Sequence, residues 1–234
     1  MSSTINRLLR VAGLAGLLAL TACASGPAAD PRDPLEPLNR SLYQFNVDVD
    51  RALLKPVATT YVEVTPAPLR TGVNNFFDNL RDGWSAVNGV LQLRPREATE
   101  NGMRFVFNST FGLAGVLDVA SEMGLERTTL DFGMTLGRWG VPDGPYLMLP
   151  ALGPSTVRDT TGTVVDNLYF PSTWINTPLT ITKAVLGALD GRVQMMRMEQ
   201  LLNESVDPYA FIKEAYYQRK EFQIYDGNPP KKAE

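Results

Sequence analysis

Histidine is absent from all 234 residues of the chain, and cysteine occurs once, at position 23. Without histidine, Ser-His-Asp and Cys-His catalysis and every metal site that needs an imidazole ligand are excluded. A single cysteine allows no intramolecular disulfide bond. No lysine stands in a recognisable serine-lysine motif, and no aspartate-rich loop has calcium-binding spacing. We therefore expect no catalytic residues, no metal and no cofactor, and an enzyme is the least favoured class.

The longest apolar run lies at the N-terminus and is too short to cross a membrane. Two arginines precede the ten apolar residues from Val11 to Leu20, which end three residues before Cys23. A helix needs about 20 apolar residues to span a bilayer. A basic start, a short apolar run and small residues at its end are typical of a cleaved signal peptide.

The residues around Cys23 predict a lipid anchor. Leu20-Thr21-Ala22-Cys23 resembles the lipobox of bacterial lipoproteins, in which the cysteine sulfur is linked to diacylglycerol and the signal is cut before it. Aspartate directly after the cysteine usually retains such lipoproteins in the inner membrane, and here that position is Ala24. The expected location is the periplasmic leaflet of the outer membrane. A secreted protein with an incidental cysteine is the alternative.

The rest of the chain is expected to form one domain. We assign residues 1–22 to the signal peptide, 23–32 to the acylated cysteine and a flexible tether, 33–226 to a single helical domain, and 227–234 to a polar tail. The chain has 22 basic and 25 acidic residues, and loss of the signal peptide's arginines makes it more acidic. An acidic balance discourages nucleic acid binding.

Apolar residues recur at helical spacing through most of this domain, which predicts an all-α fold. We expect helices over residues 35–53, ended by Pro56; 69–91, kinked or divided at Gly83; 96–111; 157–168, capped by Ser155; 181–202; and 208–222, capped by Asp207 and ended by Gly227. Residues 131–154 are too rich in glycine and proline for one regular element and predict a short helix, a turn and a hairpin-like loop. Aromatic stripes on these helices favour either a core or membrane contact.

Three blocks of sequence resemble the MlaA (VacJ) family of outer-membrane lipoproteins. They are DPLEPLNRSLYQFNVDVDRALLKPV, FGMTLGRWGVPDGPYLMLPALGPSTVRD and SVDPYAFIKEAYYQR, and they occur in the family's order. The resemblance implies a ring of amphipathic helices embedded in one membrane leaflet around a polar central channel. It also implies non-enzymatic transport: phospholipids that stray into the outer leaflet are removed and passed to a periplasmic carrier, MlaC, with a porin trimer as membrane partner.

The resemblance also implies candidate residues that line or gate the channel. They are Asn39, Arg40 and Asn46 in the first helix, which also matches the family's signature at Tyr43 and Phe45; Gly133, Gly137, Gly140, Gly144 and Tyr146, with Pro145, in the glycine-rich segment; and Arg158 and Asp159 after it. A local role as caps, ion pairs or solvated residues is the alternative for each. If the segment Gly133 to Gly153 moves as a gate, replacing Gly140 or Gly144 should change transport and leave the fold intact, provided that neither has a positive φ.

Two other functions fit the anchor and the helices. The first is a structural or assembly lipoprotein, an adaptor for outer-membrane proteins that moves no lipid. The second is a hydrolase that uses two carboxylates held in one cleft. Binding of lipid in an internal, partly polar pore separates transport from the adaptor.

Overall fold

The computed structural model describes residues 30–169, 185–189, 191–193, 202 and 204–228. The predicted signal peptide, Cys23, most of the tether, most of the helix expected over residues 181–202 and the end of the polar tail lie outside the described residues.

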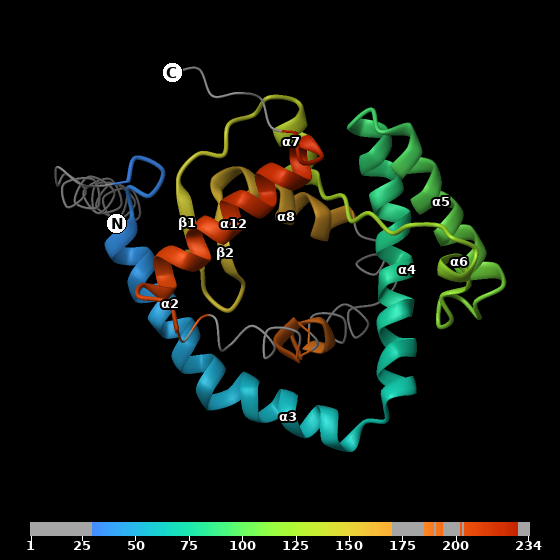
Figure 1. The fold of residues 1–234 in the computed structure, drawn as a ribbon, viewed down its shortest axis with the longest axis horizontal. Helices are drawn as coiled ribbons and strands as arrows, with labels where there is room; N and C mark the ends of the chain where they lie inside the picture. The colour runs from blue at the N-terminus through green and yellow to red at the C-terminus, as the bar shows by residue number, and fades with distance from the viewer. Residues whose placement is uncertain (1–29, 170–184, 190, 194–201, 203, 229–234) are drawn as a thin grey trace, which may run out of the picture.

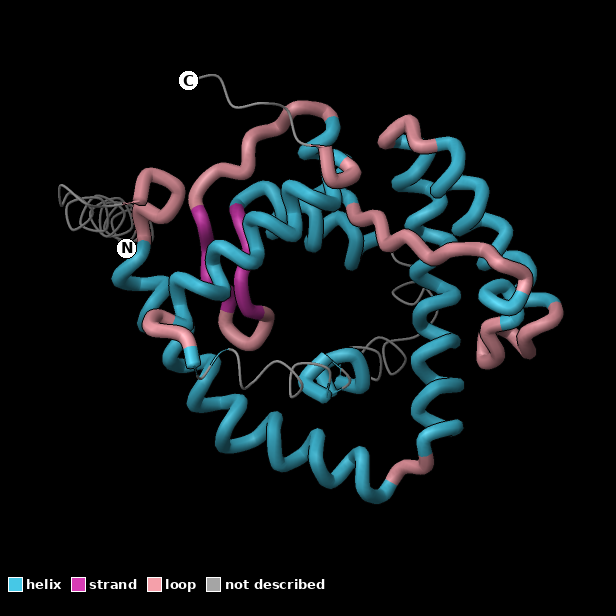
Figure 2. The backbone as a smooth tube through the Cα atoms, viewed as in Figure 1, coloured by secondary structure: helices cyan, strands magenta, loops and turns pink. Residues whose placement is uncertain are grey.

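The described helices are arranged as a ring, and a short helical segment at residues 185–189 is drawn within it, as Figures 1 and 2 show. The elements are, in order, α2 (Glu36–Val49), the π-helix η1 (Asp50–Leu54), α3 (Lys55–Val64), α4 (Ala67–Leu91), α5 (Pro95–Thr110), α6 (Val119–Glu122), α7 (Phe132–Arg138), β1 (Tyr146–Leu149), β2 (Gly153–Thr156), α8 (Val157–Tyr169) and α12 (Pro208–Tyr225). The run α2–η1–α3 and α4 form two sides of the ring, with α5 and α6 outside α4. The β-hairpin, α7, α8 and α12 complete it (Figure 1). The prediction of a mainly helical fold with one hairpin is confirmed.

The first helix does not end at Pro56, contrary to the sequence prediction. The chain stays helical to Val64 because residues 50–54 form a π-helix, in which the N–H of Lys55 donates to the carbonyl of Asp50, five residues earlier. Proline has no N–H, and in an α-helix its ring clashes with the carbonyl four residues before it. The wider turn directly before Pro56 accommodates that ring. One side of the ring is therefore a single continuous helical run.

The second helix, α4, is continuous over 25 residues, so Gly83 does not divide it. Gly83 instead lies against α5, where an added Cβ would stand 3.2 Å from the ring of Phe105. Six residues later, a Cβ on Gly89 would stand 2.9 Å from the backbone of Ala98. These contacts set α4 and α5 side by side as a close antiparallel pair (Figure 2).

The segment rich in glycine and proline folds as predicted, into a short helix and a hairpin. Asp131 caps α7, where its carboxylate accepts a hydrogen bond from the Met134 N–H at 2.7 Å. In the antiparallel hairpin Tyr146 stands opposite Thr156 and Leu149 opposite Gly153.

The cap of α8 differs from the prediction by one residue. The Oγ1 of Thr156, the last residue of β2, accepts the Asp159 N–H at 3.2 Å, whereas the hydroxyl of Ser155 contacts that of Thr160 at 2.9 Å. Both hydroxyls therefore contact the first turn of α8, but only that of Thr156 accepts a backbone N–H there.

The last helix, α12, begins as predicted. Asp207 accepts a hydrogen bond from the Ala210 N–H at 3.1 Å, and Pro208 occupies the first helical position. At its other end Arg94 and Arg138 donate to the carbonyl of Ile224 at 3.1 and 2.8 Å. The last carbonyls of a helix have no hydrogen-bond partner within it. These arginines therefore supply donors to the end of α12 and connect it to the start of α5 and the end of α7.

The distribution of side chains is the reverse of that in a water-soluble domain. Among the described residues, buried polar and charged side chains outnumber buried hydrophobic ones, and many large hydrophobic side chains are exposed. The hydrophobic clusters are small: one joins Leu130, Met134 and Ile224, and the other joins Tyr146, Met148 and Tyr209. Within the described part of the chain, no helix is both long enough and apolar enough to span a bilayer.

Candidate functional site

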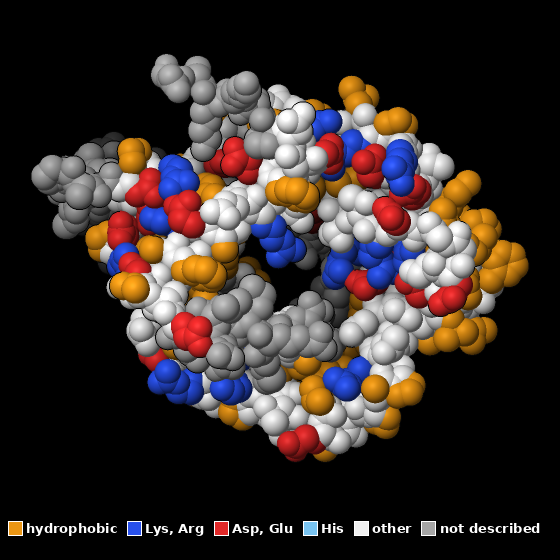
Figure 3. Space-filling view, in the orientation of Figure 1, with side chains coloured by type: hydrophobic (Ala, Val, Ile, Leu, Met, Phe, Trp, Pro, Cys, Tyr) orange, Lys and Arg blue, Asp and Glu red, His pale blue; other side chains and the backbone are white. Residues whose placement is uncertain are grey.

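The ring encloses an opening edged with charged side chains. The space-filling view in Figure 3 shows this opening, with Lys and Arg side chains at its edge, while hydrophobic side chains gather on the outer edge over α5 and α6. Large exposed hydrophobic residues of this outer region include Met103, Val106, Phe111, Leu117 and Met123. The polar side chains of α5 at positions 101, 104 and 108 are buried on its opposite face. The wall thus buries polar side chains between its helices and exposes apolar ones on its outer edge.

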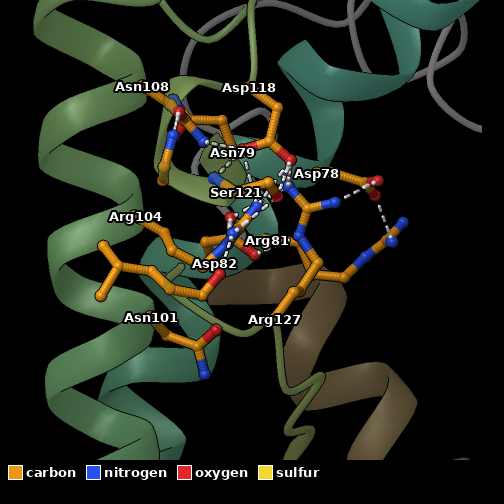
Figure 4. A network of polar contacts seen from close by, with 12 residues as sticks. Asp78, Asn79, Arg81, Asp82, Asn101, Arg104, Asn108, Asp118, Ser121 and Arg127 are labelled. Carbon is orange, nitrogen blue, oxygen red and sulfur yellow. Dashed lines mark hydrogen bonds and ion pairs between the residues drawn. The ribbon is translucent and has the colours of Figure 1, made fainter. Parts of the chain in front are cut away.

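A network of arginine and aspartate holds α4, α5 and α6 together (Figure 4). Arg104 of α5 is fully buried, and its Nε donates to Asp82 of α4 at 3.1 Å. Its Nη2 donates to both carboxylate oxygens of Asp118 at 2.7 and 2.8 Å, and its Nη1 to the carbonyl of Leu125 at 2.6 Å. Asn108 donates to the same Asp118 at 3.0 Å. A buried guanidinium with this many partners fixes the relative position of three elements.

The network continues from this buried part to a more exposed edge. Arg127 donates to Asp82 at 2.9 Å and to Asp78 at 3.1 Å, and Arg81 donates to Asp78 at 2.6 Å. Burial lowers the pKa of Arg127, but the carboxylate of Asp82 outweighs it and the pKa is raised overall. Asp78 therefore lies between two guanidinium groups, as Figure 4 shows.

The network favours the charged form of Asp118, whereas burial raises the pKa of Asp82. Burial alone raises the pKa of the Asp118 carboxyl group. Hydrogen bonds from Ser121, Asn108 and Arg104 outweigh burial and lower the pKa to about 2. Asp118 also caps α6 by accepting the Ser121 N–H at 3.2 Å.

Two candidates from the first helix, Asn39 and Asn46, fasten the hairpin to α2. Asn39 donates to the carbonyl of Tyr146 at 3.0 Å and accepts the Met148 N–H at 2.9 Å, so its amide pairs with β1 as another strand would. Asn46 does the same at the turn, with the carbonyl of Leu149 at 2.9 Å and the N–H of Ala151 at 2.8 Å. Asn39 is only 1% exposed, and its placement at a channel stays a prediction.

The side chain of Arg40 and a buried aspartate join α2 to α12. Arg40 donates to both carboxylate oxygens of Asp207, at 2.7 and 3.1 Å, and its guanidinium lies 4.4 Å from the centre of the Tyr209 ring. The buried Asp33 accepts hydrogen bonds from Asn39 at 2.8 Å, from Lys213 at 3.1 Å and from the Tyr209 hydroxyl. The first residue of the predicted domain is thereby fixed to α2 and α12.

Tyr146 is a core residue in the structure. It is fully buried beside Tyr209, Tyr216 and Tyr217. Burial raises the pKa of its hydroxyl group, which has no hydrogen-bond partner among the described residues. Its ring joins the hairpin to α12.

The four candidate glycines divide into two kinds. Gly133 and Gly137 are helical, and an added Cβ would meet Asp159 at 3.0 Å or Ile224 at 2.8 Å, so they permit close packing. Gly140 and Gly144 have φ values of +86° and +68°, which strain any other residue. The condition attached to the gating substitutions is not met, because both glycines have a positive φ. Loss of function in such variants would report strain as well as gating.

Arg158 and Asp159 pair with each other, at 3.0 Å. Asp159 also accepts a hydrogen bond from Tyr216 and lies 3.3 Å from Lys220, which bridges to Asp131 at 3.0 Å. Burial raises the pKa of Asp159, but Lys220, Tyr216 and Arg158 lower it overall. This group connects α7, α8 and α12.

The structure thus brings the sequence-predicted candidates together on the hairpin side of the ring. The opposite wall, which the sequence analysis did not assign, carries the larger charged network. One signal was available: on α5 the polar residues Asn101, Arg104 and Asn108 share one helical face, and the apolar residues Met103 and Val106 share another. The buried polar stripe, rather than the apolar one, marks the face of α5 that packs against α4.

These features define a class of protein: a ring of amphipathic helices with charged groups at its opening and an apolar exterior. The chain matches the family model described as MlaA lipoprotein over residues 31–223. Two relatives called intermembrane phospholipid transport system lipoprotein MlaA, from Shigella flexneri and Escherichia coli (strain K12), are each 39% identical over 188 residues, which is 79% of this chain and 75% of the relative. The chain belongs to the MlaA lipoprotein family, and the resemblance of the three sequence blocks is confirmed.

Two further comparisons agree. The protein of the same name from Haemophilus influenzae (strain ATCC 51907 / DSM 11121 / KW20 / Rd) is 35% identical over 195 residues, covering 81% of this chain and 78% of the relative. A solved structure, from work on the structural basis for maintenance of bacterial outer membrane lipid asymmetry, superimposes with a TM-score of 0.76 at 37% identity and covers 82% of this chain and 98% of its own.

Proposed function

We propose that this chain is the outer-membrane lipoprotein of an intermembrane phospholipid transport system. It takes phospholipids that have strayed into the outer leaflet and passes them to a periplasmic carrier of the MlaC type, and so maintains lipid asymmetry. The relatives' names and the subject of the solved structure support the coarser statement. The direction of transport, the carrier and a porin trimer as membrane partner are parts of the proposal.

The observation that carries the proposal is the reversed distribution of polar and apolar side chains around the opening. A phospholipid that crosses a bilayer must move its charged head group through hydrocarbon, where each unsatisfied polar group costs several kcal/mol, about 2–7 for an amide or hydroxyl. A polar opening in an apolar ring gives the head group a path, while the acyl chains stay in lipid. Transport of this kind breaks no covalent bond, so we infer that the protein is not an enzyme.

The proposal places the ring in the periplasmic leaflet, with acylated Cys23 as its anchor. Apolar surface gains free energy from burial in lipid in proportion to its area, and the exposed hydrophobic residues on the outer edge supply such area. In this arrangement, attachment depends on this edge and on the acyl chains.

The test uses cells that lack their own copy of the gene and express this chain. We expect the chain to lower the amount of outer-leaflet phospholipid and to restore the permeability barrier, and we expect a labelled fatty acid to mark it. The Cys23→Ser variant should be neither labelled nor correctly placed, because a serine oxygen cannot replace the sulfur. A wild-type chain that is never labelled contradicts the anchor.

A second measurement separates transport from the adaptor function. The domain without Cys23, purified and mixed with phospholipid vesicles, should bind them through its apolar edge and retain lipid after extraction into mild detergent. A domain that ignores vesicles contradicts the embedded ring. A domain that binds vesicles yet never retains lipid, and leaves outer-leaflet phospholipid unchanged in cells, favours the adaptor.

A further inference from the structure

At the more exposed edge of the charged network on α4, Arg81 and Asp78 form a partly exposed ion pair. Arg81 is 42% exposed and uses Nη1 alone to contact Asp78, which is itself 27% exposed. We propose that Asp78 and Arg81, with Arg127 behind them, bind zwitterionic phosphoethanolamine-type head groups as phospholipid passes. The inference rests on the proposed function and adds to it a site and a class of preferred lipid.

The helix geometry directs this edge toward the ring interior. Arg81 precedes Trp84 by three residues, so the two side chains are neighbours on the surface of α4. The Trp84 indole donates to Asp166 of α8 at 2.7 Å, and its ring stacks on Tyr169 of the same helix. Arg81 therefore lies one turn from the contact between α4 and α8. Figure 3 shows charged side chains of both signs along α4 at the edge of the opening.

The network contains two kinds of charged residue: buried ones held in place by hydrogen bonds, and partly exposed ones that can change partners. Arg104 and Asp82 are 1% and 2% exposed in their side chains, and their hydrogen bonds fix them in place. The Arg81 and Asp78 pair is a half-exposed contact between residues three apart on one helix, and such pairs contribute little to stability. Arg81 can leave Asp78 at small cost while Arg127 remains on it, 3.1 Å away.

A zwitterionic head group matches this edge better than an anionic one does. Its phosphate pairs with the guanidinium of Arg81, the side-chain group best suited to phosphate. Its ammonium group pairs with the Asp78 carboxylate oxygen that Arg81 releases. Each ion exchanges one partner for another, so no charge is left unpaired. A phosphatidylglycerol head group offers a phosphate and no cation, so Asp78 would be left beside a like charge.

The experiment uses the full acylated chain, reconstituted in vesicles of equal phosphatidylethanolamine and phosphatidylglycerol and then extracted in mild detergent. Mass spectrometry counts the lipids that stay bound. We expect wild type to retain phosphatidylethanolamine in excess. Arg81→Gln should lower bound phosphatidylethanolamine roughly 3- to 10-fold, the range for a charge-assisted hydrogen bond weakened by solvent. Asp78→Asn should move the ratio of the two lipids toward phosphatidylglycerol by a similar factor.

The matched control is Arg96→Gln on α5. Arg96 is 73% exposed and pairs with Glu100 four residues later. The substitution therefore removes an ion pair of the same kind outside the network. It should leave both lipids unchanged. The site is overturned if wild type retains the two lipids equally and neither Arg81→Gln nor Asp78→Asn changes their amounts. It is also overturned if wild type prefers phosphatidylglycerol. Neither result contradicts phospholipid transport. A wild type that retains no phospholipid overturns the proposed function as well.

Discussion

Replacing Arg104 by methionine should destabilise the ring wall more than any exposed substitution. The change removes hydrogen bonds from a fully buried guanidinium to Asp82, Asp118, Ser121 and the Leu125 carbonyl. Removing one partner of a buried ion pair costs about 3–5 kcal/mol, because the other charge is left without compensation. Arg127 still contacts Asp82 and Asp118, so we expect the lower end, about 3 kcal/mol.

Thermal unfolding of the purified domain in detergent measures this effect. For a domain of this size 1 kcal/mol moves Tm by about 2–4 °C, so Arg104→Met should lower Tm by about 6–12 °C. The exposed control Arg96→Met should move it by less than about 2 °C. Combining Arg104→Met with Asp82→Asn should recover part of the loss, because the orphaned carboxylate is removed. A drop within the range of the control would refute the claim that this network holds the wall.

The remaining predictions concern the hairpin and the dependence on pH. Asn46→Ala removes two hydrogen bonds to the turn between β1 and β2, so it should cost about 2 kcal/mol and speed amide exchange in the hairpin, while exchange in α4 stays unchanged. The folded pKa of Asp118 is about 2 and its ordinary value 3.8, so its stabilisation is present above pH 4 and is lost as pH falls toward 2. In urea unfolding, wild type should lose about 2 kcal/mol more than Asp118→Asn over that interval, and parallel curves would contradict the assignment.

Helix periodicity predicted the elements but not how they join. The period of α4 and the Asp207–Pro208 start of α12 depend on neighbours along the chain, and both are confirmed. Pro56 was misjudged because its effect depends on whether the preceding turn can widen, and a π-turn has no residue pattern of its own. The prediction that Gly83 kinks or divides the helix fails for a related reason. Gly83 leaves space for the ring of Phe105 from another helix, and local sequence does not show such a contact.

The candidate residues were assigned from the family resemblance, and in the structure several of them form contacts that hold the fold together. Asn39 and Asn46 bind backbone groups more than one hundred residues away, a partnership that only the folded chain reveals. Arg104 and Asp82 were missed because charged residues on an amphipathic helix are ordinarily assigned to its solvent face. That rule assumes water outside the protein, and it does not apply if the ring is embedded in a leaflet as proposed.

This reversal also explains why the wall depends on ion pairs. In water the hydrophobic effect would drive the apolar faces of α4 and α5 together, but in lipid an outward apolar face is already in an apolar medium. In lipid, the attraction between α4 and α5 must then come from close backbone contact and from hydrogen bonds and ion pairs between polar groups that have no better partner elsewhere. Gly89 against Ala98 supplies the first, and Arg104 with Asp82 supplies the second. A wall built in this way can keep polar groups at an opening, because the buried charges that stabilise the fold satisfy one another, while the partly exposed pair of Asp78 and Arg81 lies at the edge of the same network.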